Sequence, residues 1–383
     1  MSQLMQMAVG GLAALLLAGV FVWLLTPLSG RFGLVDHPAG RKTHAQPTPV
    51  IGGLAMLLAV LLMLAVPFGD VGQASLGFGL AALILTVTGA LDDRFDISWR
   101  LRIALQIVAA LVMIEVGDIR IEQVGDVFGT GSFALGAMSV PFTVFATVGV
   151  INAVNMIDGE DGLAGTLVFA ALVMLCAAAV YSGNTAVSGR AVIIAGAVAG
   201  FLLFNLRLPG HEHARTFMGN AGSAFLGLTI ACFTFRLTQN PAHPVGPILA
   251  LWLIPIPIMD CLVLMVRRLR AGRSPFAADR GHIHHLMRRA GFGSTGIVLT
   301  LTGFSLATGL GAAIALRLQL PHMLLALAFV LLCLTYYWLT SRHERAVAFF
   351  RHLRWPRQAR TSYAPAQYEG AEYELSRQEE SGD

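Results

Sequence analysis

Long apolar segments separated by short polar loops are the dominant pattern along this chain. About 20 apolar residues cross a bilayer as a helix, so the pattern predicts about eleven membrane-spanning helices. We therefore expect an all-α polytopic membrane fold, with a transmembrane region over residues 1–340 and a tail over 341–383. The expected spans lie near 5–27, 50–68, 75–91, 103–116, 139–157, 163–181, 190–206, 223–238, 247–266, 296–316 and 323–340.

Composition supports this class of protein. Of the 383 residues, 56% are hydrophobic and 13% are charged, whereas a soluble domain carries about 25% charged residues. The four cysteines all fall within apolar segments. We expect them to be small core residues, without a disulfide framework or a metal site. No nucleic-acid partner is expected.

The distribution of basic residues predicts the orientation. One set of loops, together with the tail, holds 22 of the 26 Lys and Arg residues. The positive-inside rule then places the N-terminus in the periplasm and the C-terminus in the cytoplasm. The tail begins with a basic run that we expect to contact anionic membrane lipids. It ends with an acidic segment that we expect to be disordered.

The polar motifs gather in the loops of the expected cytoplasmic side. The segment LDDRFDIS places Asp92, Asp93 and Asp96 at helical spacing. Like charges at this spacing repel each other, and carboxylates at a helix C-terminus oppose the helix dipole. A bound cation or a nearby arginine such as Arg94 would relieve both effects. The alternative is an ordinary solvated helix end.

The segment NAVNMIDGEDGLAG carries a second polar cluster. Asn152, Asn155 and Asp158 recur every three residues and so form one stripe at a helix end. Asp158-Gly159 and Asp161-Gly162 favour two turns that lead to the next span. Plain turn chemistry between two helices is the alternative. It explains the glycines but not two amides inside the apolar part of the helix, where polar side chains are usually functional.

The segment RRLRAGRSPFAADRGHIHHLMRRAGF supplies cationic groups. His282, His284 and His285 lie close together, and Arg273 and Arg280 precede them. A zinc site and a solvated basic loop are alternatives, but the run has no cysteine or spaced partner histidine. We favour an anion site in which these donors face phosphate groups. Because Mg²⁺ needs only one or two carboxylates beside phosphates and water, the motifs together indicate phosphoryl transfer with a membrane-borne reactant.

These motifs, together with RKTHAQPTPVIGG and FMGNAGS, resemble those of the polyprenyl-phosphate N-acetylhexosamine-1-phosphate transferases over roughly residues 28–295. The segment RRLRAGRSPFAADRGHIHHLMRRAGF is similar to that of the WecA branch and differs from that of the MraY branch. The resemblance implies that the phosphate of undecaprenyl phosphate attacks the β-phosphorus of UDP-GlcNAc, with UMP as the leaving group. It also implies Mg²⁺, for which Mn²⁺ can substitute, and a bacterial inner membrane protein of O-antigen or related glycan synthesis with a cytoplasmic active site.

The resemblance also implies roles for individual residues. Asp92 and Asp93 lie at the lipid phosphate and the metal, and Asp158, Asp161 and His282 join them as catalytic residues. A phosphomonoester has its second pKa near 6, so we expect the two aspartates to act mainly through metal binding and alignment, with proton removal secondary. The substrate-binding set follows, with Phe217 stacked on the uracil: Lys42, Asn152, Asn155, Phe217, Arg273, Arg280, His284 and His285.

One position departs from the family pattern. The family motif is F-M-G-D-x-G-S, in which the Asp is a metal ligand, and this chain has Asn220 there. An amide oxygen can bind Mg²⁺ but brings no charge, so we expect weaker metal binding and impaired turnover. Either the residue was introduced deliberately or the natural enzyme compensates for it, and the sequence leaves both interpretations open.

Several alternatives remain at this stage. Asp260 is a carboxylate within an apolar segment and is expected to pair with an arginine on a neighbouring span or to be functional. A transporter is the rival class, although it predicts polar residues near the middle of the spans. Another UDP-N-acetylhexosamine as the substrate is the rival within the family. The oligomeric state stays open, with a homodimer as one alternative.

Overall fold

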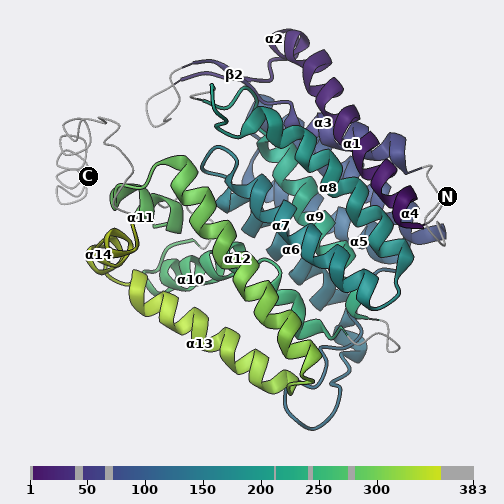
Figure 1. The fold of residues 1–383 in the computed structure, drawn as a ribbon, viewed down its shortest axis with the longest axis vertical. Coiled ribbons are helices and arrows are strands. Elements are labelled where there is room, and N and C mark those ends of the chain that lie inside the picture. Colours follow the sequence, from purple (N-terminus) through teal and green to yellow (C-terminus); the bar gives the residue numbers. More distant parts are fainter. Residues whose placement is uncertain are drawn as a thin grey trace.

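The computed structural model describes residues 3–38, 46–64, 72–210, 213–239, 245–274 and 281–354. These residues form an almost entirely helical molecule (Figure 1), which confirms the predicted all-α class. The α-helices are α1 Gln3–Leu25, α2 Ser29–Phe32, α3 Gly52–Met63, α4 Gly72–Phe95, α5 Trp99–Glu115, α6 Ser139–Ile157, α7 Leu163–Tyr181, α8 Thr185–Asn205, α9 Gly219–Thr238, α10 Pro255–Arg270, α11 Ile283–Arg289, α12 Ser294–Arg317, α13 His322–Thr340 and α14 His343–Leu353.

Eight helical segments of the described residues are long and apolar enough to cross a membrane. Three of the eleven expected spans correspond to shorter helices. They are α3 with 12 residues, α5 with 17 and α10 with 16. The protein is therefore a polytopic membrane protein by helix length and composition, and the total of eleven spans stays a prediction.

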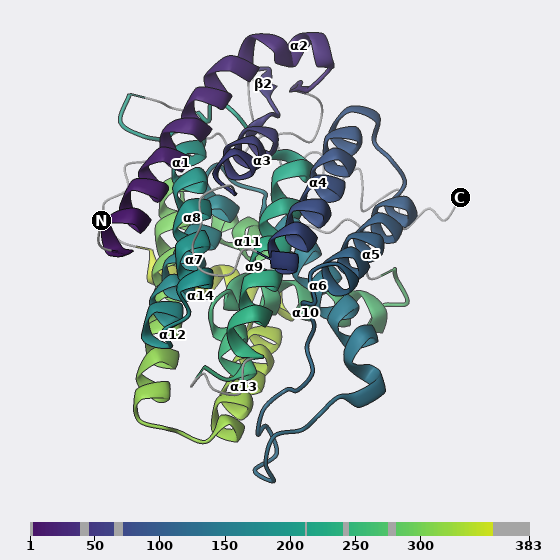
Figure 2. The ribbon, with the colours of Figure 1, turned by 90° about the vertical axis from the view of Figure 1, so that its right-hand side faces the viewer.

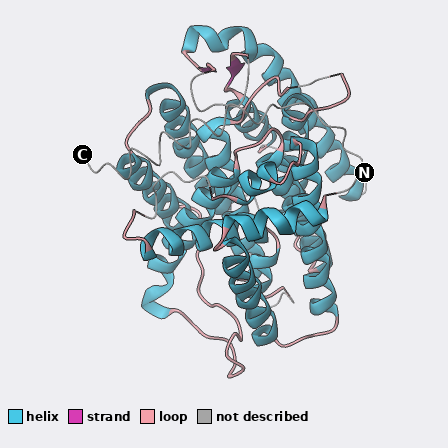
Figure 3. Ribbon diagram, turned by 90° about the vertical axis from the view of Figure 1, so that its left-hand side faces the viewer, coloured by secondary structure: helices cyan, strands magenta, loops and turns pink. Residues whose placement is uncertain are grey.

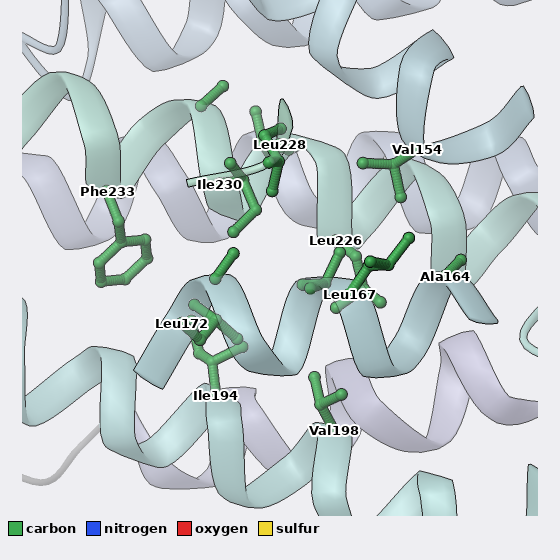
Figure 4. Packing of buried hydrophobic residues seen from close by; sticks show 14 of the residues in the cluster. Val154, Ala164, Leu167, Leu172, Ile194, Val198, Leu226, Leu228, Ile230 and Phe233 are labelled. Atoms are coloured by element: carbon green, nitrogen blue, oxygen red, sulfur yellow. The ribbon is translucent and has the colours of Figure 1, made fainter. Parts of the chain in front are cut away.

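The centre of the bundle is α9, which is buried along almost its whole length. It packs against α4, α6 and α7, and Figure 4 shows apolar side chains of α6 to α9 filling the space between these helices. Gly89 of α4 lies directly against the backbone of Ala221, and Gly227 of α9 lies against Ile151 of α6. A Cβ atom at either glycine would overlap the neighbouring helix, so small residues permit this close approach.

Two short strands join the first loop to the start of α9. Strand β1 (Val35–Asp36) pairs antiparallel with β2 (Thr48–Pro49). The next residue, Val50, bridges to Phe217, and the Phe217 N–H donates to the carbonyl of Pro49 at 2.8 Å. Figure 3 shows both strands at one end of the molecule. The early loop and the FMGN segment, far apart in sequence, are therefore neighbours.

The two ends of the bundle carry different elements. In Figure 2, β2 and α2 lie at one end, and the long α5–α6 connection and the α12–α13 turn lie at the opposite end. Helix α14 packs against α11, the helix that begins after His282. Three further 3₁₀ segments, Thr26–Leu28, Gly136–Met138 and Pro247–Trp252, complete the described elements.

Candidate active site

Asp93 fixes the N-terminus of the central helix. It lies in the last turn of α4, and its Oδ1 accepts the backbone N–H of Asn220 at 2.8 Å. Its Oδ2 accepts the N–H of Ala221 at 3.3 Å. Between these groups Gly219 has a φ of +68°, and a Cβ atom there would overlap the Asp93 carboxylate. The Asp93 carboxylate of α4 thus accepts hydrogen bonds from two backbone N–H groups in the first turn of α9. These groups have no partner within the helix itself.

Asp92, the neighbouring residue, faces a different environment. Its side chain is buried, and its Oδ2 accepts a hydrogen bond from the Arg102 guanidinium of α5 at 2.9 Å. Its Oδ1 is buried and has no hydrogen-bond partner among the described residues. Asp92 also lines a small cavity of about 30 Å³ together with Asn152, Asn155 and Asn220. Burying a carboxylate oxygen without a hydrogen-bond partner costs free energy, so we expect a ligand to bind the Asp92 oxygen in this cavity.

The expected amide stripe faces protein. Asn155 donates from Nδ2 to Asn220 Oδ1 at 2.7 Å and to Ser223 Oγ at 2.8 Å, so it connects α6 to the first turn of α9. Asn152, one turn earlier, donates to Gln106 Oε1 of α5 at 2.7 Å. These bonds explain two amides within an apolar helix, since each binds a polar group from another helix.

Residues 158–162 connect α6 to α7 and are called the third loop below. The two aspartates of this loop differ in their surroundings. Asp158 ends α6, and burial, together with the nearby charges of Asp93 and Asp161, raises its pKa to about 7. Asp161 instead accepts the Arg207 guanidinium at 2.7 Å and the N–H of Ala214 at 3.4 Å. Asp161 therefore ties the third loop to the fourth.

Three histidines adjoin this cluster from α11. Gly159, the residue after Asp158, lies directly against the ring of His284, because a Cβ atom at this glycine would overlap the ring. The ring centroid of His284 lies 5.7 Å from that of His282 and 4.2 Å from that of His285. Burial and the neighbouring histidines hold the pKa of His284 well below its usual value. A buried neutral imidazole is therefore present at the edge of the carboxylate cluster.

The third loop is also clamped to α11 by an ion pair. Glu160 accepts hydrogen bonds from the Arg288 guanidinium on both carboxylate oxygens, with the Arg288 Nε to Oε1 distance at 2.7 Å. Ser294 at the start of α12 donates to the same carboxylate at 2.9 Å. The bidentate geometry fixes direction as well as distance. It holds the histidines beside Asp158.

The site offers few oxygen donors for a metal ion. Among the described residues, no group of three or more His, Cys, Asp and Glu side chains is arranged to hold a metal, which gives the zinc alternative no support. Asp93 uses both carboxylate oxygens on α9. The free Asp92 Oδ1 and the amide oxygen of Asn220 remain at the cavity. This sparse oxygen set fits Mg²⁺, which takes its other ligands from phosphates and water.

The other expected site residues are less closely assembled. Phe217 is half-buried and is held by its backbone against residues 49–52. Arg273 is exposed just after α10. Lys42 and Arg280 lie outside the described residues. Asp96 is exposed at the end of α4, so it does not join Asp92 and Asp93.

Two carboxylates have partners other than the particular ones that the sequence suggested. Asp92 pairs with Arg102 of the next helix, whereas the guanidinium of Arg94 lies over the ring of Phe95. Asp260 pairs with His282, not with an arginine on a neighbouring span. In both cases the partner comes from tertiary packing.

Other contributors to the site were not expected from the sequence. Glu160, Gln106 and Tyr336 contribute to the site through hydrogen bonds and were not among the predicted site residues. A polar residue within an apolar helix was the available signal for Gln106, as it was for the asparagines.

Eight membrane-length helices, with a carboxylate and amide cluster against three histidines, define a polytopic membrane protein with a polar site at the end of its bundle. Residues 75–238 match the family model described as glycosyl transferase family 4. This range includes α4, α6 and the start of α9, which together carry most of the cluster.

Curated relatives match over most of the chain. An undecaprenyl-phosphate α-N-acetylglucosaminyl 1-phosphate transferase of Escherichia coli O157:H7 is 34% identical over 339 residues, which is 88% of this chain and 91% of the relative. The protein of the same name from Yersinia pestis is 34% identical, covering 87% and 91%. That of Haemophilus influenzae is 33% identical, covering 74% and 80%. The chain belongs to this family of transferases, which confirms the resemblance seen in its motifs.

Proposed function

We propose that this protein transfers GlcNAc-1-phosphate from UDP-GlcNAc to undecaprenyl phosphate. The products are undecaprenyl-pyrophosphoryl-GlcNAc and UMP. The observation that carries the proposal is the unpartnered Asp92 oxygen beside the Asn220 amide at one cavity. Asp158 lies near enough to Asp93 to interact with its charge, and His284 lies against Gly159. Relatives of the chain bear this name over 88% of its length. The arrangement supplies oxygen ligands for a cation and nitrogen donors for anions within one site.

The chemistry joins two anions, so charge neutralisation is its main demand. Asp92 and Asn220 would hold Mg²⁺, which, when bound, offsets the negative charge of the two phosphate groups. Asp93 keeps the first turn of α9 in place and so fixes Asn220. The lipid phosphate is largely dianionic near pH 7. It attacks the β-phosphorus of UDP-GlcNAc, the bond from that phosphorus to the bridging oxygen breaks, and UMP leaves with that oxygen.

The remaining residues align the nucleotide sugar. His282 directly before α11, His284 and His285 on α11, and Arg273 and Arg280 earlier in the chain would bind the phosphates and the sugar. Asn152 and Asn155 shape the wall of the cavity that both asparagines line. Asp158 and Asp161 would shape the nucleotide end, Phe217 would stack on the uracil, and Lys42 would also contact the nucleotide. The ion pair between Glu160 and Arg288 supports these assignments, because it keeps the histidines of α11 close to the aspartates of residues 158–162.

We propose that the site faces the cytoplasm of a bacterium, in the inner membrane, with eleven spans and a periplasmic N-terminus. The distribution of Lys and Arg supports this orientation. Residues 341–383 would form a cytoplasmic tail, and the basic helix α14 would contact anionic lipid headgroups. The product would enter synthesis of O-antigen or a related envelope glycan, with the protein acting alone or as a homodimer.

Release of UMP tests the proposal. Purified protein in detergent receives UDP-GlcNAc, undecaprenyl phosphate and Mg²⁺, and each component is omitted in turn. UMP release that requires all three supports the transferase, and Mn²⁺ in place of Mg²⁺ should sustain it. Release from UDP-GalNAc in preference to UDP-GlcNAc would move the proposal to another N-acetylhexosamine. If neither this chain nor its Asn220→Asp variant releases UMP from any UDP-sugar, the transferase activity is rejected.

A further inference from the structure

Asp260 is a buried carboxylate that the reaction described above leaves unused. It lies on α10 and is 1% exposed. Its Oδ2 lies 2.7 Å from Nδ1 of His282. Its Oδ1 accepts two hydrogen bonds, from the backbone N–H of Ile283 at 3.1 Å and from the hydroxyl of Tyr336 on α13 at 2.5 Å. One carboxylate therefore joins three separate elements at the base of a single histidine.

These contacts determine how the imidazole of His282 is held. Because an ionised carboxylate only accepts hydrogen bonds, Nδ1 of His282 must carry the proton that it donates to Asp260. The two ring nitrogens point away from each other, so Nε2 faces away from Asp260. It has no hydrogen-bond partner among the described residues. Nε2 is thus the nitrogen left to meet a ligand.

The ring of His282 also lies within the candidate site. It stacks against His284, with an angle of 16° between the two planes, and His284 lies directly beside Gly159. The side chain of His282 is 9% exposed. A histidine so enclosed has little rotational freedom, and its orientation depends on the group that holds Nδ1.

We propose that Asp260 and Tyr336 are positioning residues, which act through His282 so that its Nε2 faces a phosphate oxygen of the nucleotide sugar or lipid phosphate. The proposal rests on the proposed transferase function for the identity of that ligand. A phosphate oxygen at Nε2 and the carboxylate at Nδ1 are both acceptors, so the imidazolium, which carries a proton on each ring nitrogen, would meet both with charge-assisted hydrogen bonds. Tyr336 holds the carboxylate in turn, so a helix remote from the motifs contributes to the site.

The substitution Asp260→Asn separates positioning from simple packing. The Oδ1 position accepts two hydrogen bonds, so the amide oxygen of the variant occupies it and keeps both donors. The amide nitrogen then takes the place of Oδ2 and donates to Nδ1 of His282. The variant therefore retains the contacts to Ile283 and Tyr336 while reversing the tautomer, so that Nδ1 loses its proton and Nε2 carries it without a positive charge.

Two measurements test the proposal. In ¹⁵N-histidine-labelled protein, the imidazole signals of His282 are assigned as those lost in His282→Gln. We expect them to show a protonated Nδ1 in the unaltered chain and an unprotonated Nδ1 in Asp260→Asn. In the UMP-release assay, we expect Asp260→Asn to lower kcat on the order of 10- to 100-fold. We expect Tyr336→Phe, which removes one neutral hydrogen bond, to lower it about 5-fold.

A double variant shows whether Asp260 acts through His282. We expect Asp260→Asn combined with His282→Gln to be no less active than His282→Gln alone, since the carboxylate has nothing left to orient. Thr340→Val serves as the matched control for Tyr336→Phe. It removes a buried hydroxyl one turn further along α13 that bonds only the carbonyl of Tyr336, and we expect it to retain activity.

The possible failures are distinguishable. The proposal is overturned if Asp260→Asn lowers kcat by the same factor in the unaltered chain and in His282→Gln. Asp260 would then act by holding the start of α11 and not through His282. An unchanged His282 tautomer in Asp260→Asn would also overturn it. Absence of UMP release from the unaltered chain and from Asn220→Asp would reject the transferase function, and the NMR measurement would still decide the positioning role. If Asp260→Asn does not fold, Tyr336→Phe tests the proposal through the fall in kcat, which we expect to vanish in the His282→Gln background.

Discussion

Asp93 holds the first turn of α9 by accepting the backbone N–H of Asn220 at 2.8 Å. The carboxylate comes from α4, so the bond joins two helices at the point where the polar residues meet. The geometry gives Asp92 and Asp93 different tasks although they are adjacent in sequence. Asp93 maintains the shape of the site, whereas Asp92 keeps one oxygen free toward the cavity.

This division predicts the effect of Asp93→Ala. Loss of the helix cap should lower the free energy of unfolding by about 0.5–2 kcal/mol and should abolish UMP release, because Asn220 loses its support. The apparent melting midpoint in detergent and the UMP assay measure the two effects. Asp96→Asn is the control, since Asp96 is exposed just after the same helix and asparagine tolerates its φ of +49°. A melting midpoint unchanged in Asp93→Ala would contradict the capping role.

Asn220→Asp should restore a charged metal ligand. The Asn155 amide can donate to a carboxylate as it does to Asn220 Oδ1, so the surrounding contacts persist. We expect half-maximal activity at about tenfold lower Mg²⁺ and a higher maximal rate, because added ligand charge strengthens binding of a hard cation. A Mg²⁺ titration of UMP release measures both.

Asn155→Asp is the control for that variant. It adds a carboxylate at the same cavity but removes both N–H donors of Asn155, to Asn220 and to Ser223. We expect it to lower activity. Equal stimulation by both carboxylates would show that charge alone matters, and no response to Asn220→Asp would show that this chain functions with an amide ligand.

The raised pKa of Asp158 predicts that the stability of the fold depends on pH. Its pKa is raised from 3.8 to about 7, mainly by burial. Between pH 3.8 and about pH 7, Asp158 is therefore protonated in the folded state and ionised in the unfolded state. The bound proton stabilises the folded state at low pH, and this contribution to the free energy of unfolding is lost as the pH rises through 7. We expect the melting midpoint, measured with EDTA in metal-free buffer, to fall between about pH 4 and pH 7, the interval between the two pKa values.

Asp158→Asn should remove that component of the fall, since an amide does not titrate. Asp96→Asn is the matched control, because an exposed aspartate should leave the pH dependence unchanged. A fall of the same size in Asp158→Asn would assign the effect to another group.

The orientation predicts which loops an impermeant reagent reaches. With the four native cysteines replaced, Thr130→Cys in the α5–α6 connection and Arg351→Cys on α14 provide one exposed thiol each. We expect a membrane-impermeant maleimide to label Thr130→Cys in spheroplasts, and Arg351→Cys only after the membrane is opened. The reverse result would invert the proposed topology.

The sequence alone determined the apolar spans, the helical class and the motifs of the site. These follow from local rules, because the length of an apolar run and the spacing of polar residues are properties of one segment. The stripe of Asn152 and Asn155 was visible for this reason, as was the departure at Asn220. The family pattern then associated the motifs with a single reaction.

The tertiary structure decided the partners of these residues. Asp92 pairs with Arg102, Glu160 with Arg288, and Asp260 with His282. In each pair the residues come from different elements, and no periodicity of one segment links them. The close approach of helices at small residues such as Gly89 and Gly227 sets which faces meet. Burial then makes pairing obligatory, because a carboxylate in a protein interior needs a donor.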